Sequence, residues 1–183
     1  EERIRIVRRA LDIRLRIGDR IGAANALRNL ATATWLIDLE ETQKRLNEAR
    51  EIGIELQDRI GTAWTTLMLA SQKLWKSEFD EAEVLLEEGR QLAEDLNIAP
   101  MKGLAYIMLG WLYGLMGDYY KGIEWTDRGL TLARGEDNLD PAIASFAMYS
   151  VSVNAVGMGD FDRSARQHTM LKRMITAFGI LYE

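Results

Sequence analysis

Apolar residues recur along the chain at the three- and four-residue spacing of amphipathic helices. One such run comprises Ala63, Leu67, Ala70 and Leu74, and the next comprises Ala82, Leu85, Leu86, Leu92 and Leu96. The pattern predicts a partial helix at about 3–17. It then predicts helix pairs at about 21–37 and 40–56, 60–76 and 79–96, 101–116 and 119–133, and 141–157 and 161–178.

Short acidic or Gly-Asp turns separate the two helices of each pair, and an apolar residue follows each turn. These turns are Asp38-Leu39, Glu78-Phe79, Gly117-Asp118-Tyr119 and Gly159-Asp160-Phe161. Glycine tolerates the positive φ that ends one helix, and aspartate can accept the free N–H groups that open the next. The apolar residues are 40, 40 and 42 positions apart. Three residues after each of them comes a side chain small enough for close helix contact: Thr42, Ala82, Gly122 and Ser164.

The tetrapeptide DRIG also occurs twice, at 19–22 and at 58–61, which is an offset of 39 residues. The match extends outward, because ALDIRLRIGDRIG at 10–22 aligns with AREIGIELQDRIG at 49–61. Repetition at a fixed period indicates a repeat architecture. We therefore predict one repeat domain over 1–183, with a partial repeat at 1–19 and full repeats at about 20–59, 60–99, 100–139 and 140–183. The absent initiator methionine suggests a piece of a longer protein.

The third unit, YIMLGWLYGLMGDYYKG, resembles a tetratricopeptide repeat through Leu109-Gly110, Tyr113 and Gly117-Asp118-Tyr119. The period near 40 exceeds the standard length of about 34 residues. Together with the IGDR-x-G junction, it is similar to the repeats of large bacterial signal-transduction regulators of the maltose-activator type. The resemblance implies an all-α, right-handed solenoid of helix pairs whose first helices line a concave surface. It also implies that the array senses a ligand or partner for an ATPase and an effector domain.

Two parts of the chain depart from the motif. The first unit has Ile37-Asp38 in place of Gly-Asp, and the last has His168 and Leu171 where the motif prefers other residue types. We expect the last unit to pack atypically.

Composition narrows the classes of function. The 183 residues include no cysteine, which excludes disulfides, thiolate nucleophiles and cysteine-bound metals and fits a reducing compartment, so we expect a cytoplasmic protein. The net charge of −5 argues against nucleic-acid and anionic-membrane partners. The uncharged run from Gly103 to Gly117 is shorter than the roughly 20 residues of a membrane span and is interrupted by glycines.

Residues with catalytic or metal-binding chemistry are few. His168 has no cysteine or second histidine with which to share a metal, and the acidic residues around Glu78 fit a solvated helix surface. The arginines of RIRIVRRALDIRLR fit a solvated face or a face that meets neighbouring repeats. We expect no catalytic residue, metal or cofactor and no enzymatic activity; an all-α enzyme that uses acidic helices with a divalent metal is the weakest alternative.

The repeat register predicts the residues that face inward on the first helices. They are Ala24, Leu27, Arg28 and Ala31; Trp64, Leu67, Met68 and Ser71; Leu104, Ile107, Met108 and Trp111; and Phe146, Tyr149, Ser150 and Val153. Only Arg28 among them is charged. Either the first helices bury these side chains against one another, or the side chains form an apolar groove for a peptide, a partner protein or an apolar small molecule.

If such a groove exists, its binding residues are predicted to be Arg28, Trp64, Met68, Ile107, Met108, Trp111, Phe146 and Tyr149. Arg28 would orient a carboxylate or phosphate. The corresponding function is a non-catalytic binding scaffold, the sensor segment of a bacterial signal-transduction or transcription regulator. The alternative is a structural spacer or self-association module that positions catalytic domains elsewhere, and a homo-oligomer is compatible with the sequence.

Overall fold

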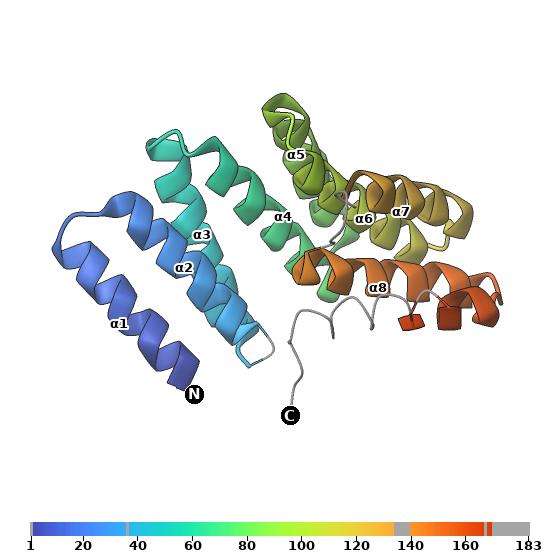
Figure 1. Ribbon diagram of the computed structural model, residues 1–183, viewed down its shortest axis with the longest axis horizontal. Helices are drawn as coiled ribbons and strands as arrows, with labels where there is room; N and C mark the ends of the chain where they lie inside the picture. The colour runs from blue at the N-terminus through green and yellow to red at the C-terminus, as the bar shows by residue number, and fades with distance from the viewer. Residues whose placement is uncertain (1, 36, 134–139, 167, 170–183) are drawn as a thin grey trace. The chain divides into compact units, whose positions relative to one another are not determined.

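The computed structural model describes residues 2–35, 37–133, 140–166 and 168–169, which contain helices and no strand (Figure 1). The helices are α1 (Glu2–Arg16), α2 (Arg20–Thr34), α3 (Leu39–Glu55), α4 (Arg59–Trp75), α5 (Phe79–Leu96), α6 (Ala99–Leu115), α7 (Tyr119–Ala133) and α8 (Pro141–Gly157). Residues 161–166 are also helical, and the rest of the helix predicted at 161–178 lies largely outside the described residues. The all-α prediction is confirmed, and the predicted bounds of α1 to α8 differ from the observed ones by at most three residues.

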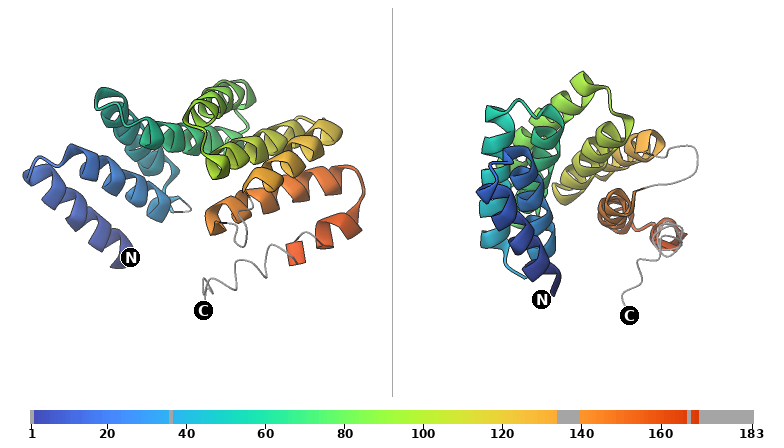
Figure 2. Two further views of the ribbon diagram at one scale, coloured as in Figure 1. Left: turned by 45° about the horizontal axis from the view of Figure 1, so that its top comes forward. Right: turned by 60° about the vertical axis from the view of Figure 1, so that its left-hand side comes forward.

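The chain forms two compact units, Glu1–Leu92 and Ala93–Glu183, and their boundary falls within α5. In the N-terminal unit α2 packs between α1 and α3, and α3 packs against α4. In the C-terminal unit α6 packs against both α7 and α8, which also contact each other (Figures 1 and 2). Within each unit, helices that follow one another in the chain therefore lie side by side, as in a helical repeat fold.

The two DRIG segments form the same structure, the capped start of a helix. The Asp19 carboxylate accepts the Gly22 N–H at 2.8 Å, and the Asp58 carboxylate accepts the Gly61 N–H at 2.9 Å. The residue before each aspartate has a left-handed backbone, as Gly18 does with φ 72°. The repeated tetrapeptide thus serves to open α2 and α4 with a side-chain cap.

The predicted Gly-Asp turns are confirmed, although glycine is not required at every one. Gly117 and Gly159 have φ of 89° and 74°, and Asp118 accepts the N–H of Lys121 at 3.2 Å. Ser77 and Asn97 adopt the same left-handed conformation with φ of 59° and 54°. The left-handed residue that ends a helix is therefore present even at turns where the sequence has no glycine.

Small residues allow close helix contact, as the sequence predicted. Thr42 and Ala82 are fully buried, and the Thr34 and Thr42 hydroxyls form a hydrogen bond of 2.8 Å between α2 and α3. Between α6 and α7 the contact is backbone on backbone, since a Cβ at Gly110 would lie 2.6 Å from the Gly122 carbonyl oxygen. No helix in the described part of the chain has both the length and the apolar character needed to cross a bilayer.

Candidate functional site

Three of the predicted binding residues belong to the N-terminal unit. Arg28 is engaged with the cap of α4: its Nη2 lies 3.6 Å from Asp58 Oδ2, and its side chain is only 12% exposed. Burial lowers the pKa of Arg28, and the Asp58 charge opposes that shift. Any ligand carboxylate would compete with Asp58 for this guanidinium. Trp64 is half-buried and Met68 is buried.

The other five belong to the C-terminal unit, where three of them form an aromatic cluster between α6 and α8. The Trp111 ring stacks on Tyr149 with centroids 5.5 Å apart and lies 6.4 Å from the Phe146 ring. Tyr149 is 42% exposed, whereas Trp111 is 3% exposed and Ile107 and Met108 are fully buried. Stacking of this kind stabilises helix packing. Burial of Met68, Ile107, Met108 and Trp111 favours the packing interpretation for these four residues.

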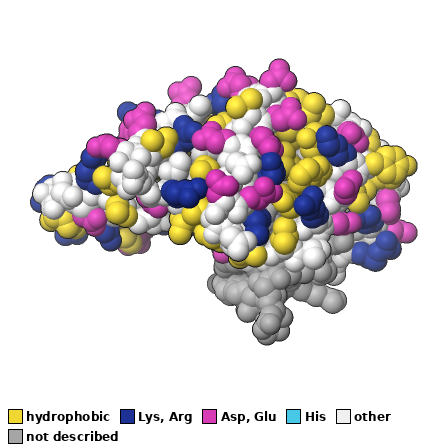
Figure 3. Space-filling model, turned by 90° about the horizontal axis from the view of Figure 1, so that it is seen from above, with side chains coloured by type: hydrophobic (Ala, Val, Ile, Leu, Met, Phe, Trp, Pro, Cys, Tyr) yellow, Lys and Arg dark blue, Asp and Glu magenta, His cyan; other side chains and the backbone are white. Residues whose placement is uncertain are grey.

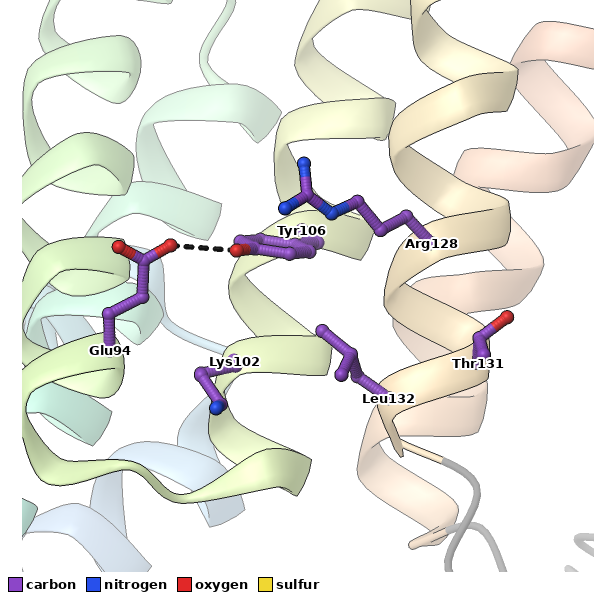
Figure 4. Close-up of a pocket in the computed structure, with 6 residues that line it drawn as sticks. All are labelled: Glu94, Lys102, Tyr106, Arg128, Thr131 and Leu132. Carbon is purple, nitrogen blue, oxygen red and sulfur yellow. Dashed lines mark hydrogen bonds between the residues drawn. The ribbon is translucent and has the colours of Figure 1, made fainter.

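A surface hollow lies elsewhere in the C-terminal unit, over α6 and between the C-terminal end of α5 and α7 (Figure 4). Its volume is about 540 Å³. It is lined by Glu94, Lys102, Tyr106, Arg128, Thr131 and Leu132. We call it the α5–α7 hollow.

Tyr106 forms the floor of the α5–α7 hollow and is held by three neighbours. Its hydroxyl donates a hydrogen bond of 2.7 Å to Glu94 Oε1. The Arg128 guanidinium lies 4.7 Å from the Tyr106 ring centroid and 5.5 Å from that of Trp125, and the two rings meet edge to face at 5.0 Å. A cation against two aromatic faces is attracted by both rings, which orients the Arg128 side chain.

The α5–α7 hollow contains two cations, Lys102 and Arg128, beside the Glu94 carboxylate that the Tyr106 hydroxyl binds. Lys102 donates a hydrogen bond of 2.9 Å to the Asn97 side chain. Arg128 lies against the Tyr106 and Trp125 rings. Within the described residues neither side chain forms an ion pair with a carboxylate. An anionic group that enters the hollow would therefore find two positive charges next to an aromatic floor.

The sequence did not predict this hollow, because the candidate residues were the inward-facing positions of the first helices, and Lys102 and Tyr106 are not among those positions of α6. The spacing of Trp125 and Arg128, three residues apart on one helix, is a signal that could have indicated it. Glu94 and Tyr106 lie on two further helices, and only their packing brings them together.

The residues considered for metal or acid–base chemistry have structural partners. His168 Nε2 is hydrogen-bonded to the Ser152 hydroxyl. The hydrogen bond from Lys73 lowers the pKa of Glu78, and Lys73 also pairs with Glu81 at 2.6 Å. Among the described residues, no three histidine, cysteine, aspartate or glutamate side chains are grouped so that they could hold a metal ion.

These features define an all-α helical repeat protein. The crystal structure of BtubC (BKLC) from P. vanneervenii is similar to this chain with a TM-score of 0.63 and 19% sequence identity, over 90% of this chain and 67% of that chain. A likeness at this identity concerns the fold. No family model matches the chain, and no curated protein matches it.

Proposed function

We propose that this chain is a non-catalytic recognition module that binds an acidic segment of a partner protein in the α5–α7 hollow. The observation that carries the proposal is the pair of cations, Lys102 and Arg128, which lie on either side of Tyr106 and form no ion pair with a carboxylate in the described part of the chain. Leu132 adds an apolar wall for a neighbouring side chain of the partner. Charge complementarity with an aromatic floor suits recognition of a peptide and requires no cofactor.

The wider role follows from the repeat pattern. The repeat period near 40 and the IGDR-x-G junction, which resemble those of maltose-activator-type regulators, support a sensor segment of a cytoplasmic bacterial signal-transduction or transcription regulator. The net charge of −5 does not favour nucleic acid or an anionic membrane as the partner. On the face of the molecule shown in Figure 3, basic and acidic side chains are interspersed, which also suits a protein partner.

A structural spacer or self-association module is the second candidate. It is supported by the burial of Met68, Ile107, Met108 and Trp111, because first helices that bury their large side chains act as packing elements. In that case the α5–α7 hollow would bind no partner segment.

Binding to an array of short peptides of graded Asp and Glu content, measured by fluorescence polarisation, tests the proposal. Acidic peptides should bind, and their affinity should fall with rising salt concentration. Arg128→Gln and Lys102→Gln should each weaken binding about tenfold, which corresponds to about 1.4 kcal/mol. Lys44→Gln, an exposed position in the other unit, removes the same charge and should bind as the unchanged chain does. Equal binding by the Arg128→Gln, Lys102→Gln double variant would refute the site.

A further inference from the structure

The helix α1 carries two apolar faces, and within the described residues one of them packs against a neighbouring helix while the other is largely exposed. Leu11 is buried, and Ile4 and Val7 pack with it against residues of α2. A second stripe consists of Ile6, Ala10, Ile13 and Ile17, at the spacing of four, three and four residues that keeps side chains on one helix face. Ile6, Ile13 and Ile17 are 59%, 41% and 70% exposed. We call this second face the α1 outer stripe.

The repeat itself shows what covers the equivalent face one unit later. At an offset of 39 residues the α1 outer stripe corresponds to Arg45, Ala49, Ile52 and Leu56. Ala49 is fully buried and Ile52 packs in the same cluster, whose α2 members are Ala23, Ala26, Leu27 and Leu30. The face is therefore closed by α2, a helix with a stripe of alanine and leucine. In Figures 1 and 2, α1 is the outermost helix of the N-terminal unit, and α2 packs against one side of it.

The α1 outer stripe is more apolar than its counterpart. Where α3 has Arg45, which pairs with Glu41 at 2.7 Å and Glu48 at 3.0 Å, α1 has the exposed Ile6. An exposed stripe of three isoleucines is costly for an unpartnered surface helix. An apolar stripe of this kind is typical of a helix surface that packs against another helix.

Arginines border the stripe on both sides. Arg3 lies along one edge, and Arg9 and Arg16 along the other, given about 3.6 residues per turn. All three are exposed, and within the described residues none is paired with a carboxylate. Two copies of α1 packed on each other would bring like charges together, which disfavours that contact. A helix with acidic borders would neutralise them.

We propose that the α1 outer stripe is the docking surface for an antiparallel amphipathic helix, outside residues 1–183, that presents an alanine-and-leucine stripe bordered by carboxylates. The packing of α2 on α3 indicates the orientation and the apolar stripe of the docked helix. The arginines that border the α1 outer stripe favour carboxylates on that helix. This docking is independent of the α5–α7 hollow, because α1 belongs to the other unit.

A peptide probe tests the proposal. The probe is a synthetic peptide with the sequence of residues 20–37, in which the residues that flank the stripe from Ala23 to Thr34 are replaced by glutamate. A matched peptide has lysine at the same positions. The isoleucine δ1-methyl NMR signals of the chain are followed during titration. Ile6, Ile13 and Ile17 should shift with the glutamate peptide, while the exposed Ile54 and Ile60 should not. The lysine peptide should bind at least about tenfold more weakly.

Two aspartate variants on α1 localise the contact. Ile13→Asp places a charge in the α1 outer stripe and should weaken binding of the glutamate peptide at least about tenfold. Leu15→Asp, 57% exposed on the opposite side of the helix, should leave binding unchanged. Circular dichroism and thermal unfolding check that both variants fold.

Three results would overturn the proposal. They are stripe methyl signals that do not respond to the glutamate peptide, equal loss of binding in Leu15→Asp, and a dimer seen by sedimentation that Ile13→Asp dissociates. The last result would assign the stripe to a second copy of this chain.

Discussion

Gly22 and Gly61 occupy equivalent positions in the first turns of α2 and α4, and both lack a side chain for the same reason. A Cβ at Gly61 would overlap the Asp58 carboxylate, which caps the helix, and would lie 2.5 Å from Arg28 Nη1. At Gly22 a Cβ would overlap the Asp19 carboxylate and the Arg14 guanidinium. The glycine of DRIG therefore makes room for an aspartate cap and its arginine partner.

Replacing Gly61 by alanine should destabilise the chain, although alanine is the better helix former by about 1 kcal/mol. Displacement of the Asp58 cap and of buried Arg28 should outweigh that gain, for a net loss of about 1–2 kcal/mol in the free energy of unfolding measured with urea. Ile60→Ala changes the exposed neighbouring residue and should have an effect within about 0.5 kcal/mol. A Gly61→Ala variant as stable as the unchanged chain would mean that the turn rearranges freely.

At the scale of elements, the α6–α7 pair depends on backbone contact more than on side-chain interdigitation. A Cβ at Gly129 would lie 2.6 Å from the Gly103 carbonyl oxygen, and a Cβ at Gly110 would lie equally close to the Gly122 carbonyl oxygen. A Cβ at Gly110 would also overlap the Thr126 hydroxyl, which donates a hydrogen bond of 2.6 Å to the Gly122 carbonyl oxygen one turn earlier in α7. Neither helix can accept a methyl group at this crossing without moving.

The Gly110→Ala substitution should therefore separate α6 from α7 and lower the free energy of unfolding by about 1–3 kcal/mol, in spite of the higher helix propensity of alanine. Denaturant unfolding followed by far-UV circular dichroism measures the loss. Glu124→Ala, on an exposed position of α7, is the matched control and should change stability little. Unchanged stability in Gly110→Ala would contradict backbone contact as the limit on helix separation.

At the scale of the whole molecule, the aromatic cluster around Trp111 bears on whether the chain recognises partners with its predicted inner face. Trp111 contacts Tyr149 and Phe146 of α8 and is almost completely buried. A residue in that position contributes to folding through the apolar area that it removes from water.

Trp111→Ala should lower the free energy of unfolding by about 3–5 kcal/mol. Tyr149→Ala, at the partly exposed partner ring, should cost less. If Trp111 were instead a central binding anchor, the same substitution would cost about 2 kcal/mol of binding free energy and leave the stability unchanged. Thermal unfolding and peptide binding measured on the same preparations separate the two outcomes, and the second would restore the inner face as the binding surface.

The helices and their turns could be predicted from the sequence because both depend on neighbouring residues. The spacing of Leu67 and Leu74 defines one helix face, and Asp19 caps a helix that begins one residue later. Even the turn at Ser77, which lacks glycine, was predicted from the period, since it lies 40 residues before the turn at Gly117.

The tertiary structure alone decided which of these residues are accessible. Whether Trp111 is buried depends on α8, some 30 residues further along the chain. The α5–α7 hollow requires Glu94, Tyr106 and Arg128 to converge from three helices, at distances that the close α6–α7 packing determines. Periodicity specifies the direction of a side chain on its own helix, whereas exposure and charge compensation depend on what the neighbouring helices place against it.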